Sequence, residues 1–172
     1  MERQSTLHRG TEVYRFRPVV LIVAPLTALA LQFLLPVYFP LTDALELPLL
    51  LVIYYALVRH SAIAGIVAGA VMGLARDTMS RDPIGVFALT STVAGYVTSV
   101  LGNRMQTEGS LIRFTIVFVL YYIHYFSHVA LNVAVLGQET EFSLSRMFLA
   151  SLVNASIGVI MFKLLDRFRK PI

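Results

Sequence analysis

The chain has 172 residues, of which 57% are apolar and only 14% are charged, and its mean hydropathy is +0.74. A soluble domain usually carries about 25% charged residues, so this composition indicates a membrane protein and leaves no room for a separate soluble domain. The absence of cysteine excludes disulfides, thiolate zinc sites and cysteine nucleophiles. The net charge of +4 comes from basic residues beside apolar runs, not from a continuous patch for nucleic acid.

Apolar runs between the charged residues predict six membrane-spanning helices. In chain order they occupy positions 18–39, 44–58, 61–75, 83–101, 111–136 and 144–165. Because about 20 residues are needed to cross a bilayer core, the second and third runs cross only if polar ends such as Glu46 and Arg76 reach the interface. A tight hairpin that re-enters the membrane is the alternative for these two runs.

We therefore expect an all-α polytopic membrane protein, a compact bundle of six transmembrane helices. The expected divisions are a basic segment at 1–17, a transmembrane domain at 18–165 and a basic tail at 166–172. The first apolar run contains Ala28 and Ala30 in the spacing of a signal cleavage site, but it continues beyond them and five further runs follow. This pattern favours a retained first helix.

Basic residues are distributed unequally between the two sides of this arrangement. The side of the termini holds 11 of the Lys and Arg residues, and the other side holds three, Arg76, Arg81 and Arg146. The positive-inside rule then predicts that both termini lie in the cytoplasm, where the basic ends are expected to meet anionic lipid.

Glycines occur at every fourth position of the third run, at Gly65, Gly69 and Gly73. In lipid, small residues at this spacing let two helix backbones approach closely. Two interpretations stay open: tight packing inside the subunit, and a docking face for the transmembrane helix of a partner.

The turn between the third and fourth runs contains a typical helix start. The Asp82 carboxylate can cap free N–H groups, and Pro83 fits the first helical position. Asp77 falls near the bilayer boundary, where a charge is costly unless it is paired, and Arg76 or Arg81 could pair with it. We expect an ion pair or a cap at Asp77, with partner or ligand binding as the alternative.

The fifth run carries an intramembrane polar stripe, with His124, His128 and Asn132 on one helical face. Hydrogen bonding to neighbouring helices, a proton or substrate path, and a metal site are three interpretations, although a zinc site would need a further ligand. The candidate partners on other runs are Gln32, Ser151 and Asn154.

No reaction chemistry is predicted from the spacing of polar residues. The chain has no G-x-x-x-x-G-K-[ST] phosphate loop, and no serine–histidine–carboxylate set is suggested. We expect no catalytic residue, no metal and no cofactor.

Several segments, read in order, resemble the rod shape-determining protein MreD family. In that family a Pro-led, Leu-rich second span precedes a glycine-rich third span that ends in Asp. A turn with Pro or a small residue before Gly follows, and the fourth span ends near Gly-Tyr. The corresponding segments here are 47–57, 65–77, 83–89 and 94–96. The positions that match the family pattern include Gly69, Gly73, Asp77 and Gly85.

The resemblance implies a non-enzymatic inner-membrane member of the rod complex, or elongasome, which directs side-wall peptidoglycan synthesis and cell shape. It implies as partners a bitopic MreC-like protein, a RodA-like glycosyltransferase, a class B penicillin-binding transpeptidase and, indirectly, the MreB filament, together with membrane lipid. The residues then expected to pack against a partner helix are Gly65, Gly69, Gly73, Asp77, Gly85 and Gly95. The alternative is a substrate-binding subunit of an energy-coupling-factor vitamin transporter, in which the polar stripe would line the pocket.

Overall fold

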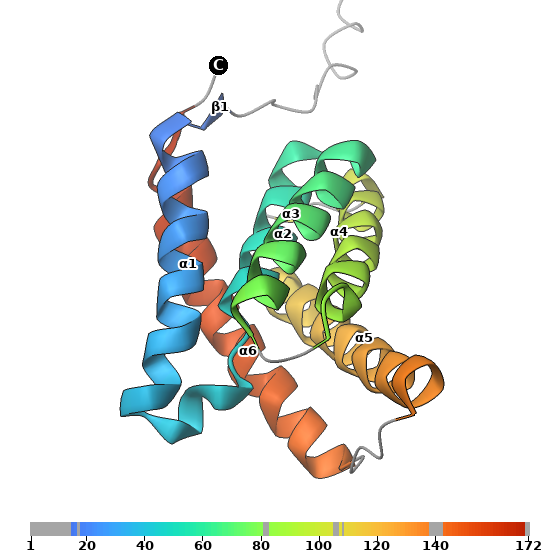
Figure 1. The fold of residues 1–172 in the computed structure, drawn as a ribbon. Helices are drawn as coiled ribbons and strands as arrows, with labels where there is room; N and C mark the ends of the chain where they lie inside the picture. Colours follow the sequence, from blue (N-terminus) through green and yellow to red (C-terminus); the bar gives the residue numbers. More distant parts are fainter. Residues whose placement is uncertain are drawn as a thin grey trace, which may run out of the picture.

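Six α-helices make up nearly all of the chain that the computed structural model describes, which is residues 15–16, 18–80, 83–104, 107, 109–137 and 143–170. The helices are α1 (Pro18–Tyr38), α2 (Leu47–Arg59), α3 (Ala62–Met79), α4 (Val86–Arg104), α5 (Ser110–Leu136) and α6 (Leu144–Asp166). Successive helices run in alternate directions through one bundle (Figure 1). The prediction of an all-α protein with six helices is therefore confirmed.

Four of these helices are long and apolar enough to cross a membrane. They are Val20–Tyr38, Ala62–Met79, Ser110–Ala134 and Leu144–Asp166. α2 has 13 residues, about 20 Å at 1.5 Å per residue, and α4 is long enough but carries many hydroxyl side chains. The count of six full crossings stays a prediction.

α2 forms the centre of the bundle. Every residue from Leu47 to Val58 is buried, and only Arg59 at its end is exposed. This segment is apolar on all sides, which is typical of a helix enclosed by other helices, and it contacts α1, α3, α4 and α6. α2 is therefore enclosed by other helices along most of its length.

α2 begins three residues later than the sequence predicted, because Pro40–Ala44 form a separate short 3-10 helix, η1. Pro48 has no N–H group, so it cannot donate to the Ala44 carbonyl as a continuing α-helix requires. Leu45 and Glu46 connect the two helices.

The connection between α3 and α4 also differs from the expectation. α3 continues to Met79, beyond the predicted end at residue 75, and α4 begins at Val86 instead of residue 83. Gly85 has φ +103°, a left-handed conformation that glycine adopts without a steric penalty. Asp82, the predicted cap, lies outside the described residues.

A short two-stranded sheet joins the first and last segments that the structure describes. Strand β1 (Arg15–Phe16) pairs antiparallel with β2 (Arg169–Lys170), with Arg15 opposite Lys170 and Phe16 opposite Arg169. Figure 1 places this pair at the end of the bundle where α2 turns into α3 and α4 leads to α5. The sequence did not indicate this pairing of residues 15–16 with residues 169–170.

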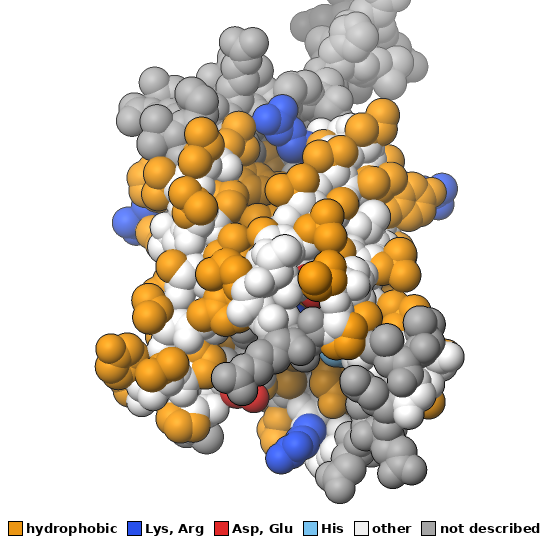
Figure 2. Space-filling model, viewed as in Figure 1, with side chains coloured by type: hydrophobic (Ala, Val, Ile, Leu, Met, Phe, Trp, Pro, Cys, Tyr) orange, Lys and Arg blue, Asp and Glu red, His pale blue; other side chains and the backbone are white. Residues whose placement is uncertain are grey.

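Apolar side chains cover most of the face of the molecule seen in Figure 2. Large hydrophobic residues are more than half exposed on α1, α3, α5 and α6, and they include Ile22, Val71, Phe126, Phe148 and Ile160. A surface of this kind is stable in hydrocarbon rather than in water.

Candidate functional site

α3 and α4 touch backbone to backbone at one end of their contact. A Cβ atom added to Gly65 would overlap the carbonyl oxygen of Gly95, and one added to Gly95 would overlap the carbonyl oxygen of Gly65. The Ser99 hydroxyl donates to the Ser61 carbonyl across the same contact, at 3.1 Å. No side chain other than hydrogen fits at either glycine without moving a backbone.

The same close approach continues toward the other end of α3. A Cβ on Gly69 would overlap the backbone of Ser91, and a Cβ on Gly73 would overlap the Cα of Ala88. The glycine face of α3 is therefore filled by α4. The sequence left two roles open for these glycines, and the structure shows them packed inside the subunit.

Asp77 links the end of α3 to the start of α4. Its side chain is 1% exposed, and its Oδ2 atom accepts hydrogen bonds from the N–H groups of Gly85, at 2.8 Å, and Ala88, at 3.1 Å. A carboxylate at a helix N-terminus satisfies free N–H groups and interacts favourably with the helix dipole. Asp77 thus caps the start of α4, which is one of the roles that the sequence predicted for it.

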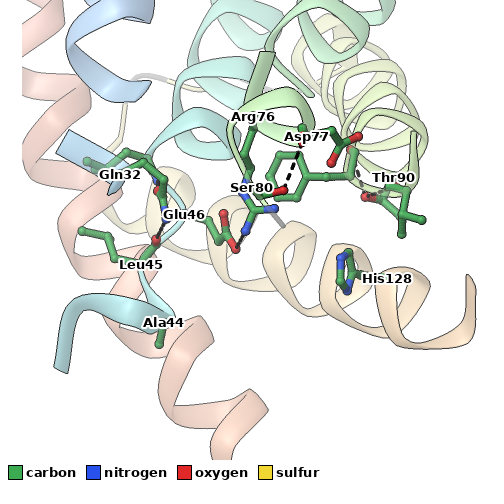
Figure 3. Close-up of polar contacts among 12 residues, drawn as sticks. Gln32, Ala44, Leu45, Glu46, Arg76, Asp77, Ser80, Thr90 and His128 are labelled. Carbon is green, nitrogen blue, oxygen red and sulfur yellow. Dashed lines mark hydrogen bonds and ion pairs between the residues drawn. The ribbon is translucent and has the colours of Figure 1, made fainter. Parts of the chain in front are cut away.

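Arg76 and Glu46 form an ion pair within the bundle, and neither reaches outward as the sequence suggested. An Arg76 Nη atom lies 2.8 Å from a Glu46 carboxylate oxygen, and both side chains are at most 15% exposed. The guanidinium also lies 3.9 Å from the centre of the Phe87 ring, a cation–π contact. Figure 3 shows this pair joining the start of α2 to the end of α3.

Three side chains from other helices bind the backbone between η1 and α2. Gln32 of α1 donates to the Leu45 carbonyl at 2.8 Å and accepts from the Leu47 N–H at 2.9 Å. The Tyr121 hydroxyl of α5 donates to the Ala44 carbonyl at 3.1 Å. These bonds replace those that a continuous helix would make, as burial of backbone groups away from water requires.

Asn154 of α6 completes this arrangement. Its amide donates to the Ala44 carbonyl at 2.7 Å and accepts from the Glu46 N–H at 2.9 Å. The sequence reasoning missed the η1–α2 break as a site. Pro48 and the isolated amides Gln32 and Asn154 in apolar helices were the available signals.

In the polar stripe of α5, His124 and Asn132 are buried and His128 is half-buried. His124 is 4% exposed, and its ring lies 4.8 Å from that of Phe87 in an edge-on contact. Asn132 donates to the His128 carbonyl at 3.0 Å and contacts its ring nitrogen at the same distance. The partners expected on other helices bond elsewhere: Gln32 and Asn154 to the η1–α2 break, and Ser151 to its own helix. Among the described residues, no three His, Asp or Glu side chains come together as a metal would require.

A second ionic contact lies at the opposite end of the bundle. Asp166 of α6 pairs with Arg113 of α5 and accepts a hydrogen bond from the Tyr54 hydroxyl of α2 at 3.0 Å. Arg113 also donates to the Thr107 carbonyl at 2.7 Å. The buried helix α2 is therefore held by amide and charged groups at its start and, through Tyr54, by Asp166 in its second half.

A family model described as rod shape-determining protein MreD matches residues 14–168, nearly the whole chain. No curated protein and no solved structure matches the chain.

Proposed function

Since this chain belongs to the MreD family of rod shape-determining membrane proteins, we propose that it is a multi-pass scaffold in the bacterial inner membrane that supports side-wall peptidoglycan synthesis. The family match over residues 14–168 carries this proposal. The chain would hold enzymes of the rod complex in position and would not itself catalyse a reaction, in agreement with a family of shape-determining proteins.

We further propose that all six helices cross the membrane with both termini in the cytoplasm. The short α2 can cross because other helices enclose it. α4 can cross because the hydroxyls that make it polar, including Thr90, Ser91, Thr98 and Ser99, are buried in the bundle. The excess of basic residues at the end that carries the termini supports the orientation.

The proposed primary partner is an MreC-like protein with one transmembrane helix. Because the glycines of α3 are filled by α4, we propose that they act by locking the two helices into a rigid pair. The partner helix then binds the outer face of α4, where Leu89, Val93 and Tyr96 are each about half exposed and share one helical stripe. Asp77 supports this surface by capping α4.

Further partners in this proposal are a RodA-like glycosyltransferase and a class B penicillin-binding transpeptidase, with the MreB filament connected indirectly. The alternative of a vitamin transporter subunit gains no support from the polar stripe, since His124 packs on Phe87 and Asn132 bonds His128.

Affinity purification of the tagged full chain from its native membranes in mild detergent, with mass spectrometry of the proteins recovered, tests this proposal. We expect an MreC-like protein together with RodA-like and penicillin-binding partners. Recovery of paired ATP-binding-cassette subunits in their place would contradict the scaffold function.

A further inference from the structure

An apolar groove of about 540 Å³ lies between α1 and α3, above the central helix α2. Figure 2 shows it as a recess between the two outer helices. None of the contacts described above fills it. Its lining includes Ile22, Leu26, Ala64, Ala68 and Val71.

The length of the groove matches one leaflet of a bilayer. Its lining on α3 extends from Ala64 to Ala75, which is roughly 17 Å at about 1.5 Å per residue. Its lining on α1 extends only from Leu21 to Leu29, mostly within the half of α1 nearest the termini. Because the hydrocarbon core of a bilayer is about 30 Å thick, the groove does not run through the full thickness and lies mainly in the leaflet on the side of the termini. A transmembrane helix of a partner would cross the full thickness, whereas an acyl chain extends through one leaflet only.

A basic side chain stands at the end of the groove nearest the chain termini. Arg59, the last residue of α2, lines the groove and is exposed. Its guanidinium makes no hydrogen bond or ion pair with any residue that the structure describes. Beside it, the Tyr55 hydroxyl donates to the Val20 carbonyl at 3.2 Å and ties α1 to α2.

Charge decides between the two kinds of occupant. The flank of a partner helix on the cytoplasmic side is usually basic, and Arg59 would repel it. A phospholipid phosphate is anionic, and a guanidinium binds it with two parallel hydrogen bonds.

We propose that this groove binds one acyl chain of an anionic phospholipid from the leaflet on the side of the termini, with the phosphate at Arg59. The lipid fills the space between α1 and α3 and so fixes the position of α1. This site is independent of the rod-complex partners.

Photolabelling tests the site in the full chain, reconstituted in nanodiscs of phosphatidylcholine. A trace phospholipid with a photoreactive group in its acyl chain is added with either a phosphatidylglycerol or a phosphatidylcholine headgroup, and mass spectrometry locates the label. We expect the anionic probe to label groove residues such as Leu26 and Val71 about fivefold more than the zwitterionic probe. Arg59→Gln should bring this ratio close to one.

Arg104→Gln is the matched control, because Arg104 ends α4 and does not line the groove. It should keep the headgroup preference. Ala68→Trp should block labelling by both probes. If that variant fails to fold, the ratio of anionic to zwitterionic labelling in Arg59→Gln is the test of the proposal.

Equal labelling by the two headgroups, or groove labelling no stronger than that of the exposed α6 residues Ile160 and Leu164, would overturn the proposal. Loss of the groove label when an MreC-like partner is co-reconstituted would assign the groove to a protein helix and would also overturn it.

Discussion

Buried polar side chains in this bundle bind mainly to backbone groups. Asp77 accepts two N–H groups at the start of α4, and Gln32 and Asn154 bind the backbone on both sides of Leu45. Inside a membrane an unbonded backbone group costs several kcal/mol, since no water can replace the partner. These side chains therefore permit the breaks at which the chain turns.

Removing the carboxylate of Asp77 should destabilise the start of α4. Asp77→Ala leaves the Gly85 and Ala88 N–H groups without an acceptor, and we expect a loss of about 1–2 kcal/mol of stability, typical of a lost helix cap. Asp77→Asn keeps an acceptor oxygen and should lose less. Thermal unfolding in detergent measures both, with the exposed Asp43→Ala as control. Equal unfolding temperatures for Asp77→Ala and the parent chain would rule out the cap.

Substituting the amides at the η1–α2 break should have a comparable effect. Asn154→Leu removes the acceptor for the Glu46 N–H, while the Ala44 carbonyl keeps the Tyr121 hydroxyl as a donor. An unsatisfied buried N–H costs about 1–3 kcal/mol. Ser156→Ala is a suitable control, because Ser156 is exposed and bonds only within α6. If the two variants unfold at the same temperature, the role assigned to Asn154 is wrong.

At the scale of elements, the contact between α3 and α4 depends on the absence of side chains. Gly69→Ala would force the Cβ into the backbone of Ser91, and we expect a loss of about 1–3 kcal/mol from overpacking. Gly109→Ala is the matched control, since its Cβ would lie 3.5 Å from Ile112, an ordinary contact. Unfolding of the two variants in the same detergent gives the comparison. A Gly69→Ala variant as stable as Gly109→Ala would exclude the backbone contact.

The number and approximate limits of the helices were predictable, because a membrane protein must place long apolar runs between its charges. The start of α2 was predicted wrongly at residue 44. That break depends on Pro48 and on an amide at position 154, which is 108 positions away from Glu46, and periodicity cannot reveal such a contact.

The candidate site was predicted in part. The spacing of Gly65, Gly69 and Gly73 indicated a close helix contact, and the structure supplies α4 as the neighbour. Spacing alone could not choose between α4 and a partner. The orientation of the Arg76 side chain could not be predicted from the sequence either, because its ion pair with Glu46 depends on how α2 and α3 pack together.

For the whole molecule, six crossings make a specific prediction about accessibility. The chain has no cysteine, so single cysteines can be introduced without other changes. In cells with a permeabilised outer membrane, an impermeant maleimide should label Ile84→Cys and Leu144→Cys, and should label Asn103→Cys and Gly109→Cys only after lysis. All four positions are exposed. Labelling of residue 103 before lysis would contradict the proposed topology.

The most direct measurement of the scaffold function is cysteine cross-linking in native membranes between the outer face of α4 and the transmembrane helix of an MreC-like partner. Val93→Cys should form a disulfide-linked product with a cysteine series along that helix. Ile160→Cys, on the exposed face of α6, should not. Cross-linking from residue 160 alone, or no product at Val93 although the partner is present in the membrane, would contradict the account.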